Sequence, residues 1–84
     1  MTFKIFLEKT AKRQIEKLDK EIMRRILESL RELEKGFSAR LDIKKLKGYD
    51  NHYRIRVGNY RIMFVIESGT VYIYDVSIRG NAYK

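Results

Sequence analysis

The sequence has no cysteine, no proline and no tryptophan, and it contains a single histidine. Without cysteine there are no disulfides and no thiolate metal sites, as is typical of proteins of the reducing cytoplasm. One histidine leaves too few ligands for a zinc site built from protein side chains. No apolar run approaches the roughly 20 residues that span a bilayer, and residues 1–7 lack the apolar core of a signal peptide. We therefore expect a cytoplasmic protein with no membrane contact, no metal and no cofactor.

Positive charge is what the sequence has in excess, with a formal net charge of +8 over 84 residues. A chain of this length forms one domain, which we place at residues 1–84. Residues 8–35 carry nine basic and seven acidic side chains, whereas residues 40–61 carry seven basic and only two acidic side chains. Such a local excess indicates a site for a polyanion, and the alternative is a lysine-rich solvated loop.

The apolar pattern predicts an α+β fold. Residues 3–7 favour a short strand, and apolar residues three or four apart favour a helix over about residues 8–18. A second helix should begin after Asp19, its expected N-cap, and end before Gly36. Segments 52–57, 60–66 and 70–78 are rich in β-branched and aromatic residues, which favours strands. We expect an N-terminal strand, a two-helix hairpin and a three-stranded antiparallel meander, forming one four-stranded sheet with both helices on one face.

Gly58 and Asn59 separate the first two strands of the meander and predict a two-residue loop with a type II′ turn. This loop places Arg56 opposite Arg61. Side chains alternate between the two faces of a strand. The expected core face carries Tyr53, Ile55, Val57, Tyr60, Ile62, Phe64 and Ile66. The other face carries His52, Arg54, Arg56, Arg61, Met63 and Val65.

The next turn, at residues 67–70, permits two loop lengths. We favour a three-residue loop of Glu67, Ser68 and Gly69, with Gly69 in the left-handed conformation. Asp75 would then lie opposite Arg61. Tyr72, Tyr74, Val76 and Ile78 would join the core face. A two-residue loop would instead bury Asp75, which costs on the order of several kcal/mol if the carboxylate is unpaired.

The arginines of this sheet face are the candidate functional residues. Like charges directly opposed in a sheet destabilise it by a fraction of a kcal/mol, roughly, unless an anion binds between them. Guanidinium groups bind phosphate oxygens in a bidentate manner and keep their charge at any working pH. Arg54, Arg56 and Arg61 therefore predict a phosphodiester site. The alternative is that Asp75 and Glu67 pair with these arginines.

Further candidates flank the arginines. Lys44, Lys45 and Lys47 precede the strand and are candidates for contacts with RNA phosphates, or else are ordinary solvated side chains. His52 shares the arginine face and is a candidate for RNA binding and proton transfer, or else a solvent-facing residue at a strand start. Tyr83 could stack on a nucleobase or cap the core.

Familiar hydrolase, nucleotide-binding and metalloprotease motifs are missing. If the protein cleaves RNA, we therefore expect the RNA 2′-hydroxyl to be the nucleophile. Arginines would stabilise the extra charge of the phosphorane-like transition state. DNA, which lacks this hydroxyl, would be spared.

The whole pattern, with LKGYDNHYRIRVGNYRIMFVI followed by VSIRGNAYK, resembles the RelE branch of the RelE/ParE toxin superfamily. The resemblance covers essentially the full chain. It implies a toxin of a type II toxin–antitoxin system that inhibits translation. Such a toxin is a ribosome-dependent endoribonuclease, which enters the ribosomal A site and cuts mRNA by 2′-hydroxyl attack. It also implies an antitoxin that wraps the toxin, in a heterotetramer or larger complex.

By the same resemblance, Arg54 and Arg56 match the two basic residues of the first hairpin strand, and Arg61 matches the arginine after the turn. Tyr83 matches the C-terminal tyrosine that stacks on a base, and Arg79 matches most nearly the basic residue before it. Together with Arg54, Arg56 and Arg61, these two are the expected catalytic residues. Some members carry lysine at positions 54 and 56, so the resemblance leaves the general base unassigned.

Two other readings remain open. A ParE-like toxin would act on DNA gyrase by protein contact and cleave nothing, since ParE-type relatives share the basic strand pair. A passive RNA-binding module would bind without cutting or toxicity.

Overall fold

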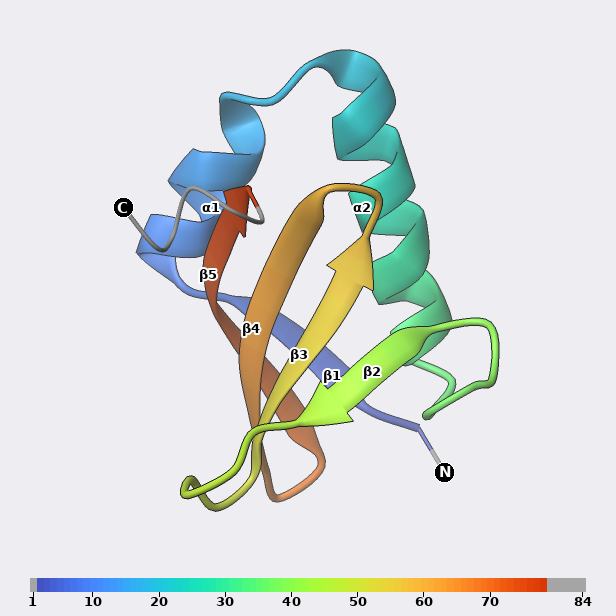
Figure 1. Cartoon of the computed structure of the whole chain (residues 1–84), viewed down its shortest axis with the longest axis vertical. Helices are drawn as coiled ribbons and strands as arrows, with labels where there is room; N and C mark the ends of the chain where they lie inside the picture. The colour runs from blue at the N-terminus through green and yellow to red at the C-terminus, as the bar shows by residue number, and fades with distance from the viewer. Residues whose placement is uncertain (1, 79–84) are drawn as a thin grey trace.

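Seven elements follow one another in the computed structural model, which describes residues 2–78 (Figure 1). Strand β1 is followed by two helices and four strands. The bounds are β1 Lys4–Leu7, α1 Lys9–Glu16, α2 Lys20–Leu33, β2 Asp42–Lys45, β3 His52–Val57, β4 Tyr60–Glu67 and β5 Thr70–Ile78. The α+β class and the order of the predicted elements are confirmed, and Asp19 is the N-cap residue of α2, although its side chain makes no capping hydrogen bond.

The sheet corrects the prediction in its size and its pairing. It has five strands in the order β1-β5-β4-β3-β2, rather than four. The additional strand β2 pairs antiparallel with β3 at one edge, and β1 pairs parallel with β5 at the other, so the sheet is mixed. Only Ile43 of β2 is apolar, so pairing with β3, rather than any local pattern, makes this segment a strand.

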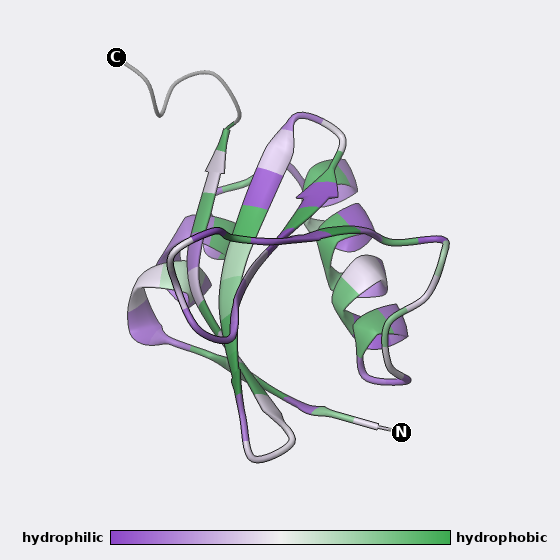
Figure 2. Ribbon diagram, turned by 60° about the horizontal axis from the view of Figure 1, so that its bottom comes forward, coloured by the Kyte–Doolittle hydropathy of each residue, from purple (hydrophilic) through white to green (hydrophobic). Residues whose placement is uncertain are grey.

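The core lies between the helices and one face of the sheet. Both helices are strongly amphipathic, and α2 buries Ile26, Leu30 and Leu33. The sheet contributes Ile55, Ile62, Phe64, Val71, Ile73 and Val76. Figure 2 shows these hydrophobic segments along β4, β5 and the inner side of α2. The opposite face of the sheet, here called the outer face, is left free of helices.

The pairing of β3 with β4 follows the predicted register. Arg56 lies opposite Arg61, and Ile55 opposite Ile62. Gly58 has a φ of +58° and Asn59 has no positive φ, as a type II′ turn requires. Ile55, Ile62 and Phe64 are completely buried, so the predicted division of this strand pair into two faces is confirmed.

The pairing of β4 with β5 differs from the prediction. The loop has two residues, Ser68 and Gly69, both with positive φ, and Glu67 pairs with Thr70. Val71 and Ile73 are therefore buried, whereas Tyr72 lies on the outer face, and the predicted core positions of Tyr72 and Tyr74 are wrong.

A β-bulge then changes the register of β5. Phe64 pairs with Ile73 and Met63 with Asp75, so Tyr74 is the extra residue. Asp75 lies opposite Met63, and Ser77 takes the predicted place opposite Arg61. The extra residue shifts the alternation of β5, so Val76 returns to the core face and Asp75 is not buried. A two-residue loop therefore does not have the cost that led us to predict a three-residue loop.

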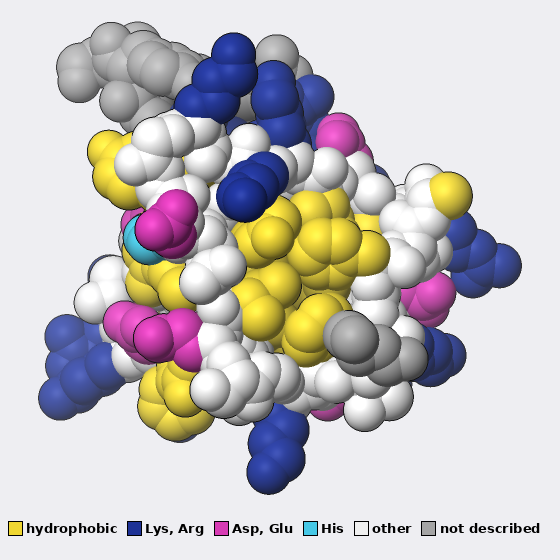
Figure 3. Space-filling model, turned by 90° about the horizontal axis from the view of Figure 1, so that it is seen from below, with side chains coloured by type: hydrophobic (Ala, Val, Ile, Leu, Met, Phe, Trp, Pro, Cys, Tyr) yellow, Lys and Arg dark blue, Asp and Glu magenta, His cyan; other side chains and the backbone are white. Residues whose placement is uncertain are grey.

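One end of the molecule exposes apolar side chains (Figure 3). A hollow of about 500 Å³ there is bounded by Phe37, Leu41, Ile43 and Tyr53, among others. Phe37 is 50% exposed, and its ring contacts those of Phe3 and Tyr53. Within residues 2–78, no helix is long and apolar enough to cross a membrane.

Candidate nucleic-acid interface

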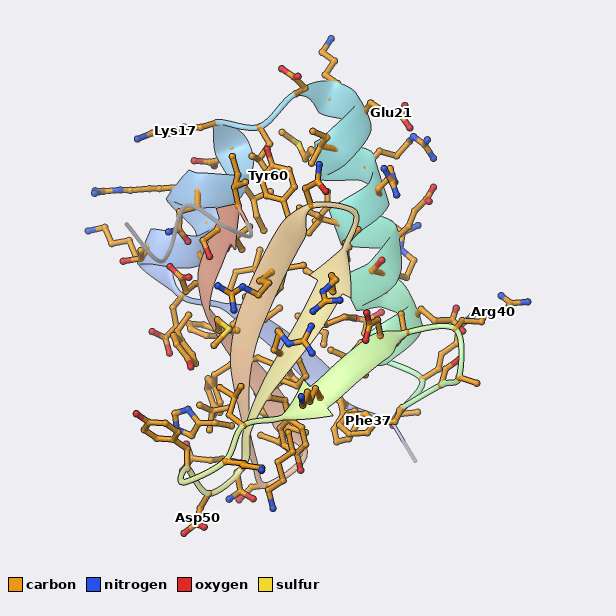
Figure 4. All side chains as sticks on the ribbon, in the orientation of Figure 1. Lys17, Glu21, Phe37, Arg40, Asp50 and Tyr60 are labelled. Atoms are coloured by element: carbon orange, nitrogen blue, oxygen red, sulfur yellow. The ribbon has the colours of Figure 1, made fainter. Side chains whose placement is uncertain are left out.

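Three arginines share the outer face. Arg54 and Arg56 come from β3, two residues apart, and Arg61 comes from β4 directly opposite Arg56. Neighbouring strands hold all three backbones by hydrogen bonding, so the guanidinium groups emerge from a rigid surface. Figure 4 shows nitrogen-tipped side chains lying together across β3 and β4, away from the helices.

Arg54 is unusually buried for a charged residue, with only 8% of its surface exposed. Its Nη1 atom is inaccessible and has no hydrogen-bond partner among residues 2–78. A buried donor left unsatisfied costs about 1–3 kcal/mol, and more for a charged group. Arg54 therefore places positive charge just beneath the outer face, and only the small exposed part of its side chain is open to a ligand.

Arg56 is only partly engaged by a carboxylate. Its Nη1 lies 3.7 Å from Oδ2 of Asp42, while its Nε is buried without a hydrogen-bond partner in the described part of the chain. Both side chains of the pair are at least a third exposed, so water screens their attraction. Asp42 faces Arg56 from β2, a strand that the sequence did not reveal.

The three candidate lysines do not lie together in the structure. Lys44 pairs with Arg54 across β2 and β3 and so lies on the arginine side. Lys45 pairs with Tyr53 and lines the Phe37 hollow, on the opposite side of the sheet. Lys47 is exposed in the loop that joins β2 to β3. The structure thus brings Lys44, but not Lys45, to the arginines.

His52 lies beside the arginines within an aromatic cluster. Its Nδ1 is 3.3 Å from the hydroxyl of Tyr74, the bulge residue. Tyr49 contacts the same imidazole, with its ring centroid 5.3 Å from that of His52. Burial, with smaller contributions from Asp75, Tyr49 and Glu8, raises the pKa of Tyr74. The tautomer of His52 sets which of the two groups donates in this contact.

Tyr49, Tyr74 and Asp42 are outer-face residues that the sequence did not identify. Tyr49 lies in the loop before β3, where strand alternation assigns no face. Tyr74 could not be found because its position depends on the bulge. The expected catalytic residues Arg79 and Tyr83 lie outside the described residues.

The outer face is suited to electrostatic chemistry on a phosphodiester. Guanidinium groups on a rigid sheet can stabilise charge that develops on phosphate oxygens, without moving. Among residues 2–78 there is no group of three or more His, Asp or Glu side chains that could hold a metal ion.

Comparison with known proteins gives a consistent result. Residues 5–83 match the family model of the ParE toxin of the parDE type II toxin–antitoxin system. Among curated proteins, the toxin RelE3 of Methanocaldococcus jannaschii is 37% identical over 83 residues, covering 95% of this chain and 94% of that protein.

Solved structures show the same relationship. A chain of the RelB–RelE antitoxin–toxin complex from Methanococcus jannaschii is similar with a TM-score of 0.80 and 36% identity, over 93% of this chain and 94% of that one. A chain of the RelE–RelB complex from Pyrococcus horikoshii OT3 gives a TM-score of 0.82 and 28% identity, over 95% of this chain and 98% of that one.

Proposed function

The chain belongs to the RelE/ParE superfamily of type II toxin–antitoxin toxins, and from this premise we propose that it is a ribosome-dependent endoribonuclease that cuts mRNA in the A site. The RNA 2′-hydroxyl gives up its proton to a base as its oxygen attacks the adjacent phosphorus, and the bond from phosphorus to the 5′-oxygen of the next nucleotide breaks. That 5′-oxygen takes up a proton, so the products are a 2′,3′-cyclic phosphate and a 5′-hydroxyl. Cutting mRNA on the ribosome inhibits translation in the cytoplasm.

The arrangement of Arg54, Arg56 and Arg61 is the observation that carries this proposal. Two like charges are directly opposed, and the neighbouring Arg54 is buried with an unsatisfied Nη1 among the described residues. A buried unsatisfied donor costs free energy, and a phosphate bound on the outer face would offset the repulsion between the two opposed guanidinium groups.

Each of these side chains then has a role. Arg54 and Arg56 hold the phosphodiester, and Arg61 stabilises the charge that accumulates in the transition state. None of them accepts the 2′-hydroxyl proton, because a guanidinium stays protonated. Lys44 and Lys47 contact the flanking backbone. By resemblance, Arg79 assists at the phosphate and Tyr83 stacks on a base.

An antitoxin is the expected protein partner. The similar RelE chains from the two archaea are found in complexes with RelB. This chain offers an exposed apolar hollow beside Phe37 and a net charge of +8, which suit an acidic segment with apolar anchors.

A ParE-like toxin is the second candidate, because the matching family model is that of ParE. In that case the chain would act on DNA gyrase by protein contact and leave RNA intact. The arginine face would then recognise a protein surface.

A purified translation reaction separates the two. The wild-type chain should cut ribosome-bound mRNA, and Arg61→Ala should slow the cutting about 100-fold or more. Arg31→Ala, which removes an exposed arginine from α2, is the matched control and should cut normally. Intact message together with failed DNA supercoiling by gyrase would establish the ParE-like function instead.

A further inference from the structure

The outer face is divided into a cationic part and an aromatic part. Towards the end of β3 lie the arginines, and at its start lies the cluster of Tyr49, His52 and Tyr74. In Figure 4 the loop labelled at Asp50, which follows Tyr49, lies at the lower end of β3, below the nitrogen-tipped side chains. His52 and Arg54 are two residues apart on one strand face, about 7 Å between Cα atoms.

The cluster holds its central ring at a defined angle. The His52 ring is 5.3 Å from that of Tyr49, at an interplanar angle of 40°, and 5.8 Å from that of Tyr74, at 64°. The contact between the Tyr74 hydroxyl and Nδ1 of His52 limits rotation of the imidazole. The His52 ring is therefore held in place before any ligand arrives.

The Tyr49 ring contributes little to the stability of the fold. Tyr49 is 61% exposed even with its contact to His52, so its burial contributes little apolar stabilisation. The loop that carries it also contains Asn51 with a φ of +59°, a left-handed turn conformation that asparagine tolerates. An exposed aromatic ring on an ordered support, next to cations, is the arrangement that binds single-stranded nucleic acid.

We propose that Tyr49, His52 and Tyr74 form a binding site for one unpaired RNA base, next to the nucleotide whose phosphate the arginines hold. This inference rests on the proposed function, because it requires RNA on the outer face. Tyr49 stacks on the base, and Tyr74 acts as a positioning residue through His52. Stacking accepts any base, so the site fixes the path of the strand rather than its sequence.

Binding of a short single-stranded RNA that carries one 2-aminopurine tests the site, because stacking quenches the fluorescence of this base. A 2′-O-methyl group at each position blocks cutting by 2′-hydroxyl attack while keeping the strand a ribonucleotide. Variants are Tyr49→Ala, Tyr49→Phe and, as a matched control, Phe37→Ala, which removes a similarly exposed ring from the other side of the sheet. Thermal unfolding of each variant checks that it is folded.

Tyr49→Ala should weaken binding about fivefold or more and abolish the quenching at one position of the strand. Tyr49→Phe should retain both, and Phe37→Ala should leave both unchanged. With an abasic residue at that position, wild type and Tyr49→Ala should bind equally. Equal binding and quenching by wild type and Tyr49→Ala on the intact strand would overturn the site, while ribosomal mRNA cutting by wild type would still support the proposed function. Absence of that cutting would reject the proposed function itself.

Discussion

At the scale of single residues, charge on the outer face is placed where it weakens the fold. Arg54 has 8% of its surface exposed and an unsatisfied Nη1 within residues 2–78. Replacing a buried charged group with an apolar one of similar volume is often neutral or stabilising. An arginine at this position is understandable if its charge stabilises a phosphate bound on the outer face.

Arg54→Met should therefore separate stability from activity. We expect a free energy of unfolding equal to or about 1 kcal/mol above that of wild type, because an unsatisfied buried charge is removed. Cutting of ribosome-bound mRNA should fall at least tenfold, because a phosphate donor is lost. Urea denaturation and the translation reaction measure the two effects. A large loss of stability would show that Arg54 is a structural residue.

Asp42→Asn should tighten RNA binding severalfold, because Asp42 competes with phosphate for Arg56. Stability should change by less than about 1 kcal/mol, since Asp42 is exposed and water screens its attraction to Arg56. Glu16→Gln removes the same charge from an exposed site on α1 and serves as the control. Fluorescence anisotropy with a labelled RNA measures the affinity, and equal effects of the two variants would mean that only net charge matters.

At the scale of elements, the β3–β4 hairpin sets the positions of the arginines. Its register was predictable because Gly58 and Asn59 specify the loop, and an alternating pattern on both sides leaves one pairing that buries the apolar face. Strand β2 was not predictable, because three of its four residues are charged or polar and only pairing holds it. The bulge at Tyr74 was hidden for a related reason, since it depends on the fit of β5 to β4 and the helices.

The same reasoning explains which parts of the candidate site could be predicted from the sequence. Arg54, Arg56 and Arg61 could be assigned to one face from alternation alone. Asp42 and Tyr74 could not, because they reach that face through β2 and the bulge.

Gly58→Ala should destabilise the chain by about 1–2 kcal/mol, because an L-residue is strained at a φ of +58°. The added Cβ would meet only the Arg25 guanidinium, at 3.5 Å, so the penalty comes from the backbone rather than from a clash. Asn59→Ala, in the same turn without a positive φ, should cost much less. Urea denaturation midpoints measure both, and equal losses would contradict this assignment of the turn.

At the scale of the whole molecule, the charge excess over residues 40–61 lies at one edge of the sheet, on the neighbouring strands β2, β3 and β4 and the loops beside β2. A polyanion bound there releases counterions, so its affinity depends on salt. Two exposed lysines, Lys44 and Lys47, extend this charge beyond the arginines.

The affinity for single-stranded RNA should fall linearly on a log–log plot against salt, with a slope of about −0.7 for each phosphate contacted. Lys44→Gln should make that slope shallower by about 0.7, the contribution of one phosphate contact. Lys45→Gln, on the opposite side of the sheet, should leave the slope unchanged. Anisotropy titrations over a salt series measure these slopes, and an equal change in both variants would show that the lysines act only through net charge.

The most direct measurement concerns the RNA itself. A message with a single 2′-deoxynucleotide at the cut position is placed on ribosomes and incubated with the wild-type chain, beside the all-ribose message. Cleavage by 2′-hydroxyl attack on an arginine-held phosphate requires that the substituted position stays intact while the all-ribose message is cut there. Equal cutting of both messages would contradict this mechanism.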